Sequence, residues 1–91
     1  MVQTRRSKAE RHKESEILDQ YHKKLTEDKL EPLFQDFIRW KQGELPYHEL
    51  TERIHEFHKA NQEIWKMFSD IDRAVLLIYA KEKLGIQQNL R

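Results

Sequence analysis

The chain has 91 residues, of which 37% are hydrophobic and 36% are charged, and its formal net charge is +1. A chain of this length forms one domain and buries only about two thirds of the surface that its unfolded form exposes. The absence of cysteine excludes disulfides, thiolate metal sites and cysteine nucleophiles. We therefore expect a small helical domain that depends on a partner, in the first place a second copy, for part of its stability.

Positive charge gathers at the start of the chain. Residues 1–13 are interpreted as a basic arm with disorder in its first turns, residues 14–86 as a single all-helical domain, and residues 87–91 as a tail. The patterns predict no helix with a continuous basic face, and the central helix is net acidic, which argues against a nucleic-acid partner. No apolar run approaches the ~20 residues needed to cross a bilayer, so a soluble cytoplasmic protein is expected.

The first half of the chain predicts two helical stretches. Ile17, Leu18, Tyr21 and Leu25 share one face of a helix from Ser7 to Asp28. Pro32 suits the first turn of a new helix or a kink in a continuous one, because it lacks an amide hydrogen. A short apolar helix follows and ends at Gly43; its apolar residues are Leu33, Phe34, Phe37, Ile38 and Trp40.

A long amphipathic helix is predicted from Pro46 to Phe68, and it carries two apolar or partly apolar stripes. The first stripe predicts a dimer seam, in which the polar Asn61 would fix register. Its residues are Tyr47, Leu50, Ile54, Phe57, Asn61, Ile64 and Phe68. The neighbouring stripe mixes aromatic bodies with polar edges and predicts a protein-binding surface. Its residues are His55, His58, Gln62 and Trp65.

The last predicted helix runs from Ile71 to Leu84, with Ser69 and Asp70 as candidate N-cap residues and Gly85 at its end. Its central run, AVLLIYA, is apolar on every side. Such a helix has to be enclosed, and two chains enclose it more easily than one.

Site chemistry is sparse in this sequence. Glu52 and His55 have the E-x-x-H spacing of carboxylate-bridged di-iron bundles, and His58 adds a third candidate ligand one turn later. A metal-binding helical bundle with ligands from two chains is therefore the alternative of a different class. No serine lies in a glycine-flanked turn and no glycine-rich loop is present, so neither an enzyme nor a cofactor is predicted.

Three stretches of the chain resemble the family of the cyanobacterial fluorescence recovery protein. They are DKLEPLFQDF, LPYHELTERIHEFHKA and QEIWKMFSDIDRAVLLIYAKEKLGI, which together lie within residues 21–86. The resemblance implies an all-α, elongated helical homodimer with a long-helix stalk and a helical head. It also implies a non-enzymatic role in photoprotection: binding the C-terminal domain of photoactivated orange carotenoid protein and accelerating its reversion.

The resemblance implies roles for particular residues as well. His55 and Glu56 fall on a His-Asp pair that the family places near its dimer and partner contacts. Glu52 stands where the family has tryptophan, and Asn61 or Gln62 where it has arginine. A homologue with the same fold and an unrelated protein partner thus stays open. The predicted partner-binding residues are His55, Glu56, Glu52, His58, Gln62 and Trp65.

Overall fold

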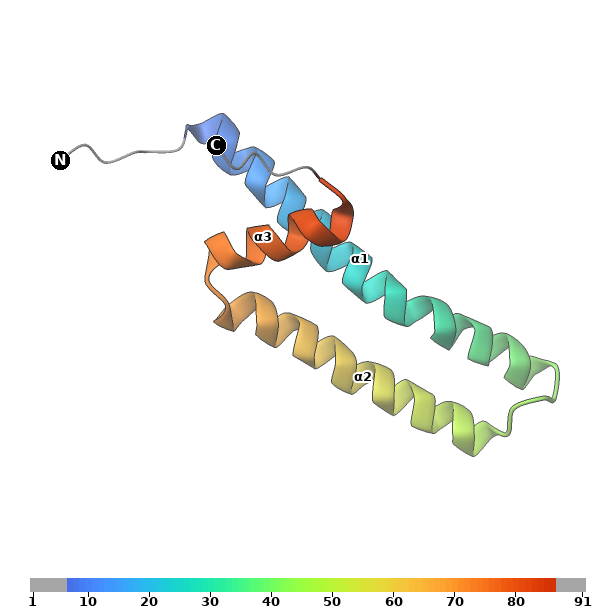
Figure 1. Cartoon of the computed structure of the whole chain (residues 1–91). Coiled ribbons are helices and arrows are strands. Elements are labelled where there is room, and N and C mark those ends of the chain that lie inside the picture. The colour runs from blue at the N-terminus through green and yellow to red at the C-terminus, as the bar shows by residue number, and fades with distance from the viewer. Residues whose placement is uncertain (1–6, 87–91) are drawn as a thin grey trace.

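The protein is an elongated assembly of three helices. The computed structural model describes residues 7–86, which contain α1 (Lys8–Lys41), α2 (Tyr47–Asp70) and α3 (Arg73–Leu84) and no strand. Figure 1 shows α1 and α2 as a long antiparallel hairpin, with α3 crossing the N-terminal half of α1. The principal extents are 65 × 23 × 20 Å. The all-α, elongated class predicted from the sequence is confirmed.

Helix α1 starts with a reciprocal pair of capping hydrogen bonds. The backbone amide of Glu10 donates to Ser7 Oγ at 3.0 Å, and the Ser7 amide donates to Glu10 Oε1 at 2.9 Å. This capping box satisfies two amides that the first turn of a helix leaves without partners. Residues 8–13 of the predicted basic arm are therefore helical, while residues 1–6 and 87–91 lie outside the described part of the chain.

Helix α1 continues without interruption through Pro32 for 34 residues. The boundary predicted at Asp28 is wrong, and the alternative of one continuous helix holds. Proline removes a single amide donor, that of residue 32, and leaves the Asp28 carbonyl without its usual helical partner. The rest of the helix keeps its hydrogen bonds and is packed against α2 and α3, which outweighs one missing donor.

Replacing Pro32 with alanine should stabilise the protein. Proline is about 3 kcal/mol less favourable than alanine in a helix interior, and its stiffening of the unfolded chain offsets up to about 1 kcal/mol of that difference. We expect the free energy of unfolding to rise by about 2 kcal/mol in urea titrations followed by circular dichroism. An unchanged or lower value would mean that the helix is built around the proline.

A short turn at residues 42–46 joins the two long helices. Gly43 adopts a φ of 79°, in the left-handed region that favours glycine, and Leu45 is buried beneath the turn. Pro46 occupies the N-cap position of α2 with extended backbone angles. The predicted helix from Pro46 to Phe68 is confirmed within two residues at each end, because its periodic apolar pattern is long and unbroken.

Helix α3 begins two residues later than predicted. Its N-cap is Asp72, whose carboxylate accepts a hydrogen bond from the Ala74 amide at 3.1 Å, whereas Ser69 and Asp70 belong to the last turn of α2. The predicted end is confirmed. Gly85 has a φ of 73°, and the backbone amide of Ile86 donates a hydrogen bond to the Lys81 carbonyl at 2.8 Å, as in a Schellman motif.

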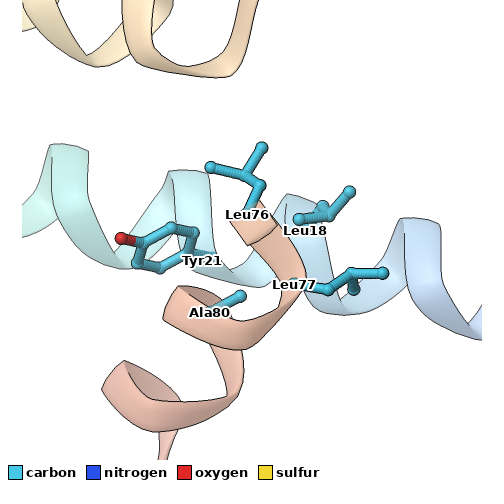
Figure 2. Close-up of a cluster of buried hydrophobic side chains, with 5 residues drawn as sticks. All are labelled: Leu18, Tyr21, Leu76, Leu77 and Ala80. Atoms are coloured by element: carbon cyan, nitrogen blue, oxygen red, sulfur yellow. The ribbon is translucent and has the colours of Figure 1, made fainter. Parts of the chain in front are cut away.

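The head core is a cluster of five buried side chains between α1 and α3. Figure 2 shows two of them on α1 and three on α3, and they are Leu18, Tyr21, Leu76, Leu77 and Ala80. Met67 and Phe68 at the end of α2 pack against the cluster, so all three helices meet there. Burial is the main cause that raises the pKa of the Tyr21 hydroxyl above 10.0, and the charge on Tyr79 adds to it.

The outer side of α3 is not covered by the other residues within 7–86. Val75, Ile78 and Tyr79 remain exposed to between 39% and 46%. Within one protomer, α1 and the end of α2 cover only one side of α3, so the predicted enclosure of this helix is incomplete.

An ion-pair network ties the end of α3 to the middle of α1. The Asp28 carboxylate lies 3.1 Å from Lys24 Nζ and 3.4 Å from Lys83 Nζ. The hydrogen bond from Lys24 is the main cause that lowers the pKa of Asp28 below 3.8, and Lys83 adds to it. The pKa of Asp28 is lower in the folded chain than in the unfolded chain, so the ionised carboxylate stabilises the fold at pH values above the unfolded pKa. This stabilisation is lost as the pH falls through the folded pKa.

Asp28→Asn should therefore be less stable than the unmodified chain at about pH 7. The difference should disappear as the pH falls below 3.8 and through the lower folded pKa, as measured by urea titrations across this range. The groups are exposed, so ~1 M salt should shrink the difference at neutral pH. A difference that persists in acid would contradict this electrostatic origin.

Candidate interaction surface

The C-terminal half of α1 exposes a row of large apolar side chains. Leu30, Phe34 and Phe37 recur at four- and three-residue spacings, and Phe34 is 58% exposed. With Leu33 they line a shallow apolar depression of about 350 Å³. A row of this kind is typical of a helix face that meets another protein surface.

Helix α2 exposes a second row. Tyr47, Ile54 and Trp65 are 73%, 39% and 58% exposed, and His58 lies on the same stripe of the helix. The hydrophobic side of α2 is thus wider than the part that packs within the chain. Leu50 and Ile64 fill the packed part and are buried.

Both exposed rows lie on the side of the hairpin that α3 leaves uncovered. On α1, Tyr21 joins the head core with α3, and Leu30 and Phe34 lie on the opposite side of the helical cylinder. On α2, Met67 packs on the same cluster, and Trp65 lies on the other side of the helical cylinder from Met67, at the border of the head. We call this surface the open face; its residues are Leu30, Phe34, Phe37, Tyr47, Ile54, His58 and Trp65.

A cleft of about 370 Å³ lies where the three helices converge. Its apolar lining comes from the head region, and Asp19, His22 and Arg73 add polar groups. The full lining of this head cleft is Ser15, Leu18, Asp19, His22, Trp65, Phe68, Ile71, Arg73 and Leu76. Because Trp65 belongs to both surfaces, the cleft adjoins the end of the open face.

Two polar side chains are held in fixed positions around the cleft. The His22 ring lies 4.2 Å from the Trp65 ring and 4.9 Å from the Phe68 ring, measured between centroids, and its Nε2 is buried without a hydrogen-bond partner among the described residues. Arg73 donates to Ser15 Oγ at 3.0 Å and lies 3.9 Å from the Glu14 carboxylate. The aromatic contacts fix the inner side of the Trp65 indole and leave its outer part exposed.

The predicted dimer seam divides into two parts in the structure. Leu50 and Ile64 are buried within the single chain, and Phe57, Asn61 and Phe68 are partly buried. The remaining members, Tyr47 and Ile54, are exposed on the open face. A second copy would therefore meet the edge of the predicted seam, since α1 already occupies its centre.

The predicted partner-binding residues are exposed but do not form a single patch. Glu52, His55 and Glu56 line a shallow groove of about 350 Å³ with Thr51 and Lys59 on the exposed side of α2, and Glu56 also borders a hollow that α2 shares with α1. We call this groove the outer edge. The others lie toward the open face: His58 and Trp65 are part of it, and Gln62 lies between the two surfaces.

The E-x-x-H motif does not gather a set of metal ligands within the described chain. Among residues 7–86, no three His, Asp or Glu side chains lie close enough together to hold a metal ion. Glu52, His55 and His58 follow one another along the exposed side of α2 instead. A metal site at these residues would need ligands from a second chain.

Sequence reasoning missed the head cleft. Neither Asp19 nor His22 nor Arg73 was predicted to belong to a shared site. One signal was available: His22 follows Leu18 by one turn on the apolar side of its helix, where a polar residue has to find a special environment. Its neighbours Trp65 and Arg73 are distant in sequence, so no spacing pattern predicts their convergence.

None of the described helices is long and apolar enough to cross a membrane. Comparisons with protein-family models, curated proteins and solved structures found no match to this chain.

Proposed function

We propose that this protein is a small non-enzymatic regulator that forms a homodimer through its open face and acts by binding another protein. The observation that carries the proposal is the two rows of exposed large apolar side chains, one on each helix of the hairpin. Soluble monomers rarely expose large apolar patches, whereas helical homodimers bury such faces.

A homodimer fits this surface for two further reasons. The open face extends along most of the hairpin, so a second hairpin laid on it would form a four-helix layer with a shared core. Copies of one chain also meet through the same surface on both partners, which requires that a single face supply all the contacts. The open face has this composition, with aromatic and aliphatic residues on both helices.

The outer edge of α2 is the proposed surface for the second protein. Glu52, His55 and Glu56 project there beside Lys59, and none of them forms a salt bridge with another described residue. A charged, hydrogen-bonding groove next to a dimer seam suits a partner with complementary polar groups. A dimer would carry two copies of this surface.

The proposed partner is the C-terminal domain of orange carotenoid protein, on the strength of the family resemblance at His55 and Glu56. A regulator of this kind accelerates reversion only if it binds the intermediate conformation or the transition state more tightly than the activated form. An unrelated protein partner for the same fold is the alternative, motivated by Glu52 in place of the family tryptophan.

Recovery of photoconverted orange carotenoid protein from its red to its orange form tests the proposed partner. The rate should rise in proportion to added chain, and the two proteins should co-elute. Glu56→Lys should reduce both effects, whereas Glu82→Lys on the exposed side of α3 should preserve them. No acceleration and no co-elution would reject this partner and leave the alternative.

A further inference from the structure

Four exposed residues of α2 on the open face have a spacing that reads the same in both directions. Tyr47, Ile54, His58 and Trp65 are separated by seven, four and seven residues, with an aromatic residue at each end. Seven residues are close to two helical turns and four are close to one, so all of these side chains lie along one stripe.

A palindromic stripe is complementary to itself. If a second α2 packs antiparallel on the first across a twofold axis near Glu56, every residue meets a counterpart at the mirrored position. Tyr47 then lies opposite Trp65 of the second copy, and Ile54 lies opposite its His58.

This register brings Tyr47 to the head cleft of the other chain. Tyr47 is 73% exposed, the highest value among the exposed large hydrophobic residues, and its ring lies 5.7 Å from the ring of the neighbouring His48, measured between centroids. Trp65 is 58% exposed at the mouth of the cleft while His22 supports its inner side. The two most exposed aromatic residues of α2 thus keep large parts of their rings uncovered in one chain and would cover each other in two.

We propose that the head cleft of each protomer is completed by the second copy, with the Tyr47 ring packed on Trp65 at its mouth and the phenol hydroxyl directed to the Asp19 carboxylate. The pair combines an aromatic contact with a polar tip, which is the use of tyrosine that interfaces favour. The inference rests on the proposed homodimer and adds its register and the residue that closes the cleft.

Cross-linking tests the register directly, because the chain contains no cysteine. Chains carrying Tyr47→Cys and chains carrying Trp65→Cys would be mixed and treated with a short bismaleimide. The mixture should give a cross-linked dimer, whereas either variant alone should not, since two copies of position 47 would lie about 27 Å apart along the helix. His55→Cys should cross-link with itself beside the axis.

The controls separate this inference from the proposed dimer. Tyr79→Cys on α3 mixed with Trp65→Cys should give no cross-linked product. A dimeric mass by light scattering without the 47–65 product would overturn the register and leave the homodimer standing. A monomeric mass of the unmodified chain at all concentrations would overturn both.

Fluorescence gives a second measurement, in which Trp65 itself is unchanged. In a Trp40→Phe background, Trp65 is the only tryptophan. Its emission should shift to longer wavelength when Tyr47→Ala is added and should stay unchanged with Tyr47→Phe, at concentrations where light scattering shows a dimer. The proposal would be contradicted if the Trp40→Phe protein and its Tyr47→Ala and Tyr47→Phe derivatives, all at a dimeric mass, had the same emission maximum.

Discussion

Replacing Leu76 with alanine should lower the free energy of unfolding by about 2–5 kcal/mol. Leu76 is 3% exposed in the head core, where it lies with Leu18 and Tyr21 between α1 and α3. Removing its branched end takes away apolar contacts and leaves a cavity that neighbouring side chains fill only in part. Because small domains have a total stability of about 5–15 kcal/mol, this loss is large.

The matched control is Val75→Ala on the adjacent position of α3. Val75 is exposed, so its replacement should change the free energy of unfolding by about 0.5 kcal/mol or less. Urea titrations at a fixed protein concentration provide both values, and the concentration must be fixed because dimerisation contributes to stability. Equal effects of the two substitutions would show that α3 does not pack on α1 through Leu76.

Replacing Ile54 with glutamate should weaken the homodimer at least about 100-fold, which corresponds to about 3 kcal/mol. Ile54 lies in the middle of the exposed row on α2, where a second copy would remove the new carboxylate from water. The substitution leaves the fold intact, because Ile54 is already 39% exposed in one chain. Circular dichroism should therefore be unchanged while the mass falls to that of a monomer.

Val75→Glu serves as the matched control, because Val75 is also 39% exposed but lies on the outer side of α3. It should keep the dimeric mass. The control also tests a rival interface, since Ile78 and Tyr79 beside it are exposed as well. If Val75→Glu separates the chains and Ile54→Glu does not, the interface lies on α3.

Local patterns predicted the helices well, and the exceptions have physical causes. The long periodic pattern of α2 predicted its extent, and Gly43 and Gly85 marked the ends of the helices that precede them. Pro32 indicated a helix boundary because proline removes a donor, but tertiary packing maintains α1 across it. The N-cap of α3 is Asp72, whereas Ser69 and Asp70 were predicted. All three residue types are favourable at an N-cap, so residue preference alone does not identify which of them is used.

The sequence predicted less well which apolar faces are buried within one chain and which remain exposed. A periodic pattern shows that a face is apolar but not which element covers it, so Leu50 and Ile64 were predicted to meet a second chain although they are buried within one. The head cleft depends on residues from three helices that converge only after folding. The surplus of apolar surface on α2, in contrast, was evident from its two stripes, and in the structure it is the open face.

The mass of the unmodified protein in solution tests the central claim most directly. Light scattering at micromolar concentrations should give twice the chain mass of 11.2 kDa, and dilution should eventually release monomers. A folded, helical protein that remains at 11.2 kDa at every concentration would contradict the account, because its open face would then be stable in water without a second copy.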